Sequence, residues 1–205
     1  MSMSQSDPKR SFTRFPLVSL GAEYLVMGHL LRRNILTYKA PPNNEGYDLI
    51  CIHPDPRVAG RQVRVQVKSR LATDSDRGFP VKERTIAAFD FLVVAFLNVG
   101  YFFGKSKNGP PEAGRCDPEF FTFPAAFIRE HHNATSSWEK VRTRGLDIES
   151  YRGDRGFEQV AQLLEIAYPS QVKSGEGVNT RMEPAGMMAR TSCDRCCAGG
   201  SCARR

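Results

Sequence analysis

Long apolar segments are missing from this sequence. Its longest strongly apolar stretch, residues 89–100, is interrupted by Asp90 and Asn98, whereas a helix that crosses a membrane needs roughly 20 apolar residues. The first 14 residues are polar, and no apolar signal core follows them, which is not the pattern of a secretory signal peptide. We therefore expect a cytoplasmic protein that does not interact with membranes.

Cysteine, tryptophan and acidic side chains are scarce or unevenly placed. Only 22 Asp and Glu stand against 29 Lys and Arg, so the 205-residue chain has a formal net charge of +7, and tryptophan occurs once. Four of the six cysteines lie in the last 13 residues, which is not the spacing of a disulfide-linked secreted domain, so we interpret them as reduced thiols. The positive charge suits nucleic acid or another anionic surface and by itself selects neither.

The remaining composition, 40% hydrophobic and 25% charged, is typical of a folded domain. We expect a flexible amino terminus over residues 1–14, one folded domain over residues 15–169, and a disordered basic tail over residues 170–205, because the tail has no apolar repeat. Four tail cysteines could in principle close a zinc site: Cys193, Cys196, Cys197 and Cys202. Their spacing lacks a second pair, so we favour free thiols over zinc.

The apolar periodicity of the folded domain predicts both helices and strands. A stripe at helical spacing predicts a first helix over residues 17–33 with the stripe on its buried face. The stripe comprises Leu17, Leu20, Tyr24, Met27 and Leu31. The other predicted elements are a short extended segment over 35–38, strands over 47–53, 61–69, 91–97 and 120–123, and helices over 124–129 and 157–168. This order favours an α/β fold with a central mixed β-sheet flanked by helices.

Three polar residues lie on two strands that we expect to form a hairpin. Asp48 begins one strand, and Gln66 and Lys68 are two residues apart on the next, so their side chains point to one face. Asp48 can join them across the hairpin. A carboxylate and an amide oxygen suit Mg²⁺, and a nearby lysine can orient or deprotonate a water for attack on a phosphodiester. The alternative is an exposed hairpin face whose polar residues have no function.

Glu23 falls on or beside the apolar stripe of the first helix, where an uncompensated carboxylate is costly. Helix capping does not explain it, because the capping-box position three residues after Ser19 is Ala22. Glu23 is therefore a further candidate for the site. The alternative is an ion pair with Arg32, Arg33 or a loop lysine.

These residues resemble the motifs of the PD-(D/E)XK nuclease superfamily, whose core has a helix with a Glu, a strand with an Asp, and a strand with Glu-x-Lys or Gln-x-Lys. The matching segments are Gly21-Ala22-Glu23, Gly46-Tyr47-Asp48-Leu49-Ile50, Val65-Gln66-Val67-Lys68 and Asp90-Phe91-Leu92-Val93-Val94-Ala95. The Gln-x-Lys form is similar to that of Mrr-type restriction nucleases and some intron-homing nucleases. Tyr47 replaces the proline that gives the superfamily its name, and Gln66 removes one negative charge.

The resemblance implies a restriction-endonuclease-like core with a Mg²⁺ site, in which Mn²⁺ can substitute. It implies that Asp48, Gln66, the Val67 carbonyl and Glu23 are metal ligands and that Lys68 positions the attacking water. Because Gln66 is neutral, Glu23 supplies the second formal charge at this site. No small-molecule cofactor is expected.

Basic residues on and after the strand that carries Lys68 predict contacts to DNA phosphates. They are Arg61, Arg64, Arg70, Lys82 and Arg84. We expect the polar loop over residues 70–84 to become ordered on DNA. Four aromatic residues are interpreted as packing groups rather than as base-stacking groups: Phe120, Phe121, Phe123 and Trp138.

The sequence thus predicts a metal-dependent DNA endonuclease that hydrolyses phosphodiester bonds. A homodimer is expected for double-strand cleavage, since one site cuts one strand. Two alternatives stay open: a DNA-binding module of the same fold whose site is catalytically weak or inactive, and a structural protein whose hairpin face meets a partner. Metal-dependent nicking separates the first alternative from the enzyme, and the second predicts no DNA affinity once the tail is removed.

Overall fold

The computed structural model describes residues 16–42, 44–58, 60–103, 109–135 and 138–167. The expectations for the amino terminus, for the tail and for a zinc site at Cys193–Cys202 therefore lie outside the described residues. Two cysteines fall within them, the buried Cys51 and the exposed Cys116, and both are free thiols. Burial raises the pKa of Cys51 to about 12, while its hydrogen bond with Thr37 opposes that rise.

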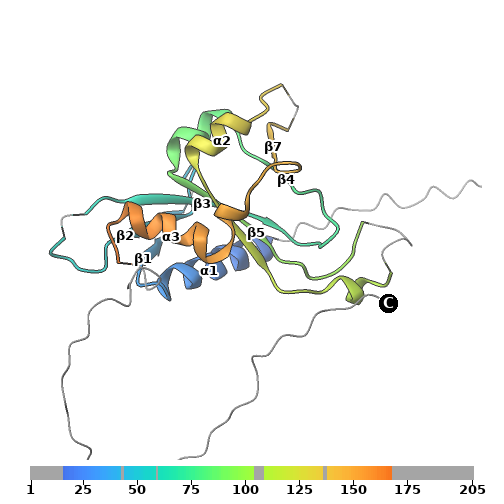
Figure 1. Ribbon diagram of the computed structural model, residues 1–205, viewed down its shortest axis with the longest axis horizontal. Coiled ribbons are helices and arrows are strands. Elements are labelled where there is room, and N and C mark those ends of the chain that lie inside the picture. The colour runs from blue at the N-terminus through green and yellow to red at the C-terminus, as the bar shows by residue number, and fades with distance from the viewer. Residues whose placement is uncertain (1–15, 43, 59, 104–108, 136–137, 168–205) are drawn as a thin grey trace, which may run out of the picture. The chain divides into compact units, whose positions relative to one another are not determined.

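Five strands form a central mixed sheet in the spatial order β1-β2-β3-β5-β6 (Figure 1). Their bounds are Leu36–Lys39 for β1, Leu49–Ile52 for β2, Val63–Arg70 for β3, Phe91–Phe96 for β5 and Glu119–Pro124 for β6. β3 and β5 run parallel, and the other neighbouring pairs run antiparallel. The expected α/β fold with a central mixed sheet is thereby confirmed, as is the antiparallel hairpin of β2 and β3.

Both faces of the sheet are covered, so a central strand can be apolar on both of its faces. All six residues of β5 are buried, as its continuous apolar sequence requires of a strand packed on both sides. In β3 the valines point to one apolar layer, while Gln66 and Lys68 occupy the alternate positions. The register places Leu49 of β2 opposite Val65 of β3, and Val65 opposite Phe91 of β5.

Two helices, α1 (Pro16–Leu31) and α3 (Gly153–Leu163), cover one face of the sheet. In Figure 1 they lie on the same side of the strands, opposite α2. α3 approaches closely at Gly156, where a Cβ atom would lie 2.2 Å from the Tyr151 carbonyl oxygen. The same Cβ atom would lie 2.9 Å from Thr122 Cβ of β6, so glycine is required where α3 packs beside this strand.

The predicted apolar face of the first helix is wrong, although the helix itself is present. Ala22, Val26 and Leu30 are the fully buried residues of α1, whereas Leu17 is 78% exposed and Tyr24 is 56% exposed. Leu20 and Leu31 are also exposed, and Met27 is half-buried. α1 is apolar on nearly all sides, so periodicity alone could not determine which stripe meets the sheet.

The second apolar layer lies on the opposite face, beneath α2 (Ala125–His131) and the 3₁₀ helix η1 (Glu83–Ala88). A two-stranded antiparallel sheet of β4 (Gly78–Pro80) and β7 (Lys140–Arg142) also packs there, through Phe79 and Val141. Two further 3₁₀ helices are η2 (Pro111–Gly114) and η3 (Glu149–Tyr151). The segment predicted as a polar loop therefore contains a strand, β4, which pairs with a strand about 60 residues later.

Three of the four aromatic residues that were predicted to pack are buried, and the fourth is exposed. Phe120, Phe121 and Phe123 are buried and form part of the two apolar layers, as expected. Trp138 is 70% exposed and contributes to neither layer. It lies two residues before β7. The packing interpretation rested on the lack of basic-aromatic alternation around Trp138, which does not determine its burial.

Candidate functional site

A cavity of about 290 Å³ lies beside the carboxyl-terminal half of β3, and we call it the strand-end pocket. It is lined by Ser19 and Glu23 of α1, by Asp48, by residues 67–70 of β3 and by Pro80 of β4. The fold thus brings together Glu23, Asp48, Val67 and Lys68, four of the residues that the sequence analysis singled out. Gln66 is not part of the lining.

Asp48 is held in place by backbone contacts on three sides. Its nitrogen donates to the Val65 carbonyl at 2.9 Å, and its carbonyl oxygen accepts from the Ala40 nitrogen at 2.8 Å. Its carboxylate Oδ2 accepts a hydrogen bond from the Val67 nitrogen at 2.7 Å. Among the described residues Oδ1 has no hydrogen-bond partner, so one carboxylate oxygen is fixed against β3 and the other is available to a ligand.

The turn before Asp48 depends on Gly46. Its φ of +106° belongs to the left-handed region, and a Cβ atom there would lie 2.4 Å from the Ala88 Cβ atom. Glycine is thus required for both conformation and space. The side-chain nitrogen of Asn44 closes the turn by donating to the Tyr47 carbonyl at 2.8 Å.

Gln66 lies opposite Asp48 when the register of β2 and β3 is extended by one residue. Its side chain is buried, with 9% exposure. In the described part of the chain, Gln66 Oε1 and Thr122 Oγ1 are the buried side-chain oxygen atoms without a hydrogen-bond partner. A buried amide oxygen without a partner is unfavourable by roughly 1 to 3 kcal/mol unless a ligand or cation contacts it.

Lys68 lies on the same strand face as Gln66 and is half-buried. Burial lowers the pKa of Lys68, Asp48 acts in the opposite direction, and the positive charges of Arg70 and Lys82 lower it further. Lys68 and Asp48 are therefore close enough to interact electrostatically. The pocket combines an anchored carboxylate with a partly desolvated amine.

Glu23 forms a close ion pair with Lys39 of the edge strand β1. The Glu23 side chain is 17% exposed and that of Lys39 is 31% exposed, so the pair is partly buried. Lys39 also lies 5.9 Å from the centroid of the Tyr24 ring. The sequence analysis proposed Arg32, Arg33 or a loop lysine as the alternative partner. The lysine that the fold supplies comes from a strand 16 residues later, which no local pattern indicates.

The five predicted DNA contacts have different surroundings. Arg64 pairs with Asp90 at 3.1 Å, and Arg84 pairs with Glu45 at 2.6 Å, so both guanidinium groups already have carboxylate partners. Arg70 is half-buried and donates to the Gly78 carbonyl, and burial lowers its pKa. Arg61 and Lys82 are exposed. Lys82 is the exposed residue of this set whose charge acts on Lys68.

The oxygen atoms around the pocket are of the type that binds a hard divalent cation, but they carry less negative charge than such a site usually has. A carboxylate oxygen of Asp48 and the partnerless Gln66 amide oxygen are ligands of the kind that Mg²⁺ prefers. Within the described ranges no group of three or more His, Cys, Asp or Glu is placed to hold a metal. This agrees with the chemistry of the set, because one position is an amide and Glu23 is engaged by Lys39.

The fold and the pocket together define a mixed α/β protein with an acid, an amide and a lysine gathered at two central strands. No family model and no curated protein matches the sequence. Among solved structures the chain is similar to "The structure of a bacterial homing endonuclease: I-Ssp6803I", with a TM-score of 0.40 and 18% sequence identity, over 73% of this chain and 92% of that chain. At this score and identity the likeness assigns neither activity nor ligand.

None of the helices in the described residues is both long enough and apolar enough to cross a membrane. The longest of those helices, α1, has 16 residues.

Proposed function

We propose that this protein is a metal-dependent DNA endonuclease and that the strand-end pocket is its active site. The observation that carries the proposal is that Glu23, Asp48 and Lys68 line one small pocket. Gln66, which lies opposite Asp48 in the extended register of β2 and β3, adds a buried amide oxygen without a partner among the described residues. An isolated hairpin face would not require an anchored carboxylate, a desolvated amine and an unsatisfied oxygen at one place.

Each residue has a distinct role in the proposed reaction. Asp48 Oδ1, Gln66 Oε1 and the Val67 carbonyl would hold Mg²⁺ or Mn²⁺, with Glu23 as a further ligand when it leaves Lys39. A bound divalent cation supplies charge stabilisation for the scissile phosphate and the leaving oxygen. Lys68 holds the attacking water on the same side of the pocket. The Val67 nitrogen keeps Asp48 oriented throughout by its hydrogen bond of 2.7 Å.

Plasmid nicking in the presence of Mg²⁺ or Mn²⁺ tests this function. Asp48→Asn and Lys68→Ala are expected to reduce nicking by at least about 100-fold, the usual loss when a catalytic acid, base or metal ligand is removed. Asp147→Asn is the matched control, because Asp147 is exposed and lies outside the pocket lining. Equal nicking by wild type and both pocket variants would exclude the proposed active site.

The ion pair of Glu23 with Lys39 favours one second candidate, a DNA-binding module of the same fold without effective catalysis. With Glu23 paired with Lys39, Asp48 is the one carboxylate of the pocket lining that has no ion pair among the described residues. This candidate predicts a gel shift with a steep salt dependence and no metal-dependent nicking. Nicking that requires Lys68 would exclude it.

We further propose a homodimer that joins through the exposed face of α1. Leu17, Tyr24 and Leu31 are exposed and are spaced seven residues apart. Gly21 and Gly28 lie between them, and no described atom outside the surrounding helix lies within 4 Å of the position that a Cβ would occupy. In an antiparallel pair of α1 helices, a large side chain of one copy can face a glycine of the other, so the surface is complementary to itself.

A further inference from the structure

A second cavity, of about 630 Å³, adjoins the strand-end pocket and shares Ser69 and Arg70 with it. We call it the aromatic pocket, and its defining residues are Leu71, Ala72, Asp74, Asp76, Phe102 and Phe103. Phe102 is 57% exposed and Phe103 is 66% exposed. Two adjacent exposed phenylalanines beside an active site are unusual, because in water they gain none of the stabilisation of burial.

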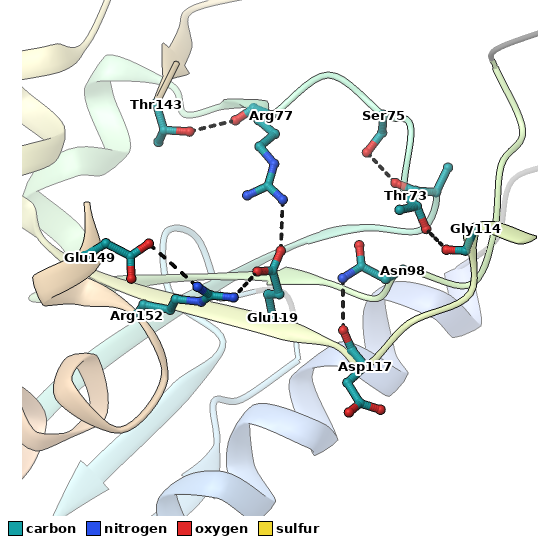
Figure 2. Close-up of polar contacts among 11 residues, drawn as sticks. Thr73, Ser75, Arg77, Asn98, Gly114, Asp117, Glu119, Thr143, Glu149 and Arg152 are labelled. Carbon is teal, nitrogen blue, oxygen red and sulfur yellow. Dashed lines mark hydrogen bonds and ion pairs between the residues drawn. The ribbon is translucent and has the colours of Figure 1, made fainter. Parts of the chain in front are cut away.

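The backbone of the two phenylalanines is held by a single carboxylate. Asp74 accepts a hydrogen bond from the Phe102 nitrogen with one oxygen and from the Phe103 nitrogen with the other, each at 2.9 Å. Figure 2 shows how the loop that carries Asp74 is itself fixed: the Thr73 hydroxyl donates to the Gly114 carbonyl at 2.5 Å, and the Ser75 hydroxyl donates to the Ala72 carbonyl at 2.7 Å. The backbone of Phe102 and Phe103 is therefore held by a loop that is itself fixed by hydrogen bonds.

A third cavity, of about 520 Å³, shares Asp76 with the aromatic pocket. We call it the arginine pocket, after its lining residues Arg77, Arg142 and Arg144. Arg77 is not available to a ligand, because its guanidinium lies 2.9 Å from the Glu119 carboxylate, which also accepts from Arg152 at 2.5 Å (Figure 2). Within the described ranges, neither the Arg142 side chain nor the Arg144 side chain has a hydrogen-bonding or ionic partner.

The three pockets follow one another in a defined chemical order. The strand-end pocket has a lysine and the proposed metal ligands. The aromatic pocket has two phenylalanine rings, and the arginine pocket has guanidinium groups without a partner among the described residues. Lys140 pairs with Asp76 at 3.1 Å, and both oxygens of Asp74 hold the phenylalanine backbone, so the charges of the middle pocket are largely balanced. The exposed aromatic rings therefore define its ligand, because a base stacks on such rings without a charge. A nucleic-acid strand has this alternation, with a phosphate on either side of each base.

We infer that the aromatic pocket binds an unstacked nucleobase next to the phosphate in the strand-end pocket, with the following phosphate held by Arg142 and Arg144. The inference rests on the proposed function for the identity of the first pocket. Phe102 and Phe103 provide the π-surfaces on which any base can stack, so the ligand is single-stranded or locally unpaired DNA. An apolar peptide would leave the guanidinium groups of Arg142 and Arg144 without a role.

Oligonucleotides with and without bases test this inference on the full-length protein. Fluorescein-labelled thymidine oligonucleotides of about 12 nucleotides are compared with abasic strands of equal length and charge, in EDTA so that no cleavage occurs. Wild type is expected to bind the thymidine strand about 5-fold to 100-fold more tightly, as one stacked base requires. The Phe102→Ala, Phe103→Ala double variant is expected to bind both strands within about twofold of each other.

Two controls separate base recognition from charge and from folding. Arg142→Ala is expected to weaken binding of both strands and to reduce the salt slope by about one, without changing the preference for bases. Tyr38→Ala removes another exposed aromatic residue, 51% exposed, and is expected to leave the preference intact. Since Phe102 and Phe103 are exposed, the double variant is expected to unfold at the wild-type temperature.

The outcomes decide the two proposals separately. The base pocket is overturned if wild type binds the thymidine and abasic strands equally, or binds neither. It is also overturned if the double variant still prefers the thymidine strand. Nicking by a protein without base preference would leave the endonuclease proposal standing. Base preference without any metal-dependent nicking would retain the pocket and overturn the proposed hydrolysis.

Discussion

The carboxylate of Asp48 accepts a hydrogen bond from the backbone nitrogen of Val67 at 2.7 Å, across the β2–β3 hairpin. This bond links the residue just before β2 to the backbone between Gln66 and Lys68. The orientation of the carboxylate is therefore set by the sheet, which is a rigid support for a site. A substitution that keeps this hydrogen bond can therefore distinguish the structural role of Asp48 from its proposed role as a metal ligand.

Asp48→Asn is such a change, because the asparagine oxygen can still accept from Val67 while its nitrogen is no ligand for Mg²⁺. The expected result is a protein that unfolds within a few degrees of wild type and has lost Mg²⁺ binding. Calorimetric titration with Mg²⁺ and thermal unfolding of the same samples provide the two measurements. Unchanged Mg²⁺ affinity would contradict the assignment of Asp48 as a ligand.

Gln66→Glu adds the carboxylate that the resemblance to Glu-x-Lys motifs would place here. Mg²⁺ binding is expected to tighten by about tenfold or more, because a full charge near the cation outweighs the cost of burying it once the cation is bound. Without metal the variant is expected to be less stable than wild type, since the new carboxylate is buried. Unfolding temperature measured against Mg²⁺ concentration shows both effects.

A fall in Mg²⁺ affinity on this change would contradict the proposed ligand set. Gln66→Leu serves as the control of similar size, and it is expected to bind no Mg²⁺ at Mg²⁺ concentrations that stabilise wild type.

Lys39→Met removes the partner of Glu23 and is expected to raise Mg²⁺ affinity and the nicking rate, because the second carboxylate is then free to act as a ligand. Stability is expected to fall by about 1 kcal/mol, the typical contribution of a partly exposed pair. Glu23→Gln is expected to lower Mg²⁺ affinity in the Lys39→Met background more than in wild type. Equal effects in the two backgrounds would show that Glu23 is structural only.

Asp90 gives the stability a defined pH dependence. Although burial raises the pKa of Asp90, hydrogen bonds from the Arg64 side chain and backbone outweigh it and hold the pKa below its usual value. A carboxyl whose pKa is lower in the folded state stabilises the fold above its unfolded pKa, and this stabilisation is lost as the pH falls through the folded pKa.

Chemical denaturation below pH 5 is therefore expected to show a decline in unfolding free energy that is smaller in Asp90→Asn. At pH 7 this variant is expected to be less stable by about 1 to 2 kcal/mol, a reduced value because both side chains are partly exposed. Parallel acid declines in wild type and variant would contradict the role of this pair.

Tyr24→Glu tests the proposed α1 interface, because it places a charge at the centre of the exposed apolar face. Sedimentation velocity is expected to show a dimer for wild type and a monomer for the variant, with little change in unfolding of the monomer since Tyr24 is 56% exposed. Tyr38→Glu, on the edge strand β1, is the control and is expected to remain dimeric. Dimerisation of the Tyr24 variant would place the interface elsewhere.

The elements with a clear period could be predicted from sequence, and those defined by distant contacts could not. The alternation of Val63, Val65 and Val67 predicted β3 and its two faces correctly. β4 and β7 have three residues each and pair with each other, so neither contains a local period. α1 was predicted as a helix with the wrong face, because both faces of it are apolar.

The sequence predicted some residues of the candidate site but not their ion-pair partners. Glu23, Asp48 and Lys68 were found by residue type and spacing, and the fold places them around one pocket. Lys39 was missed, and Arg64 was interpreted as a DNA contact although Asp90 is its partner. Ion pairs between residues 16 and 26 positions apart depend on tertiary structure, which spacing along the chain does not contain.

Trp138 has a practical consequence for experiments on this protein. It is the one tryptophan of the sequence, it is 70% exposed, and it lies two residues before Lys140, which lines the aromatic pocket. Intrinsic emission excited at the indole band therefore originates from a single site next to the surface proposed for DNA. Ligand binding can be followed by quenching or a wavelength shift of this native fluorophore, without attaching a dye to the protein.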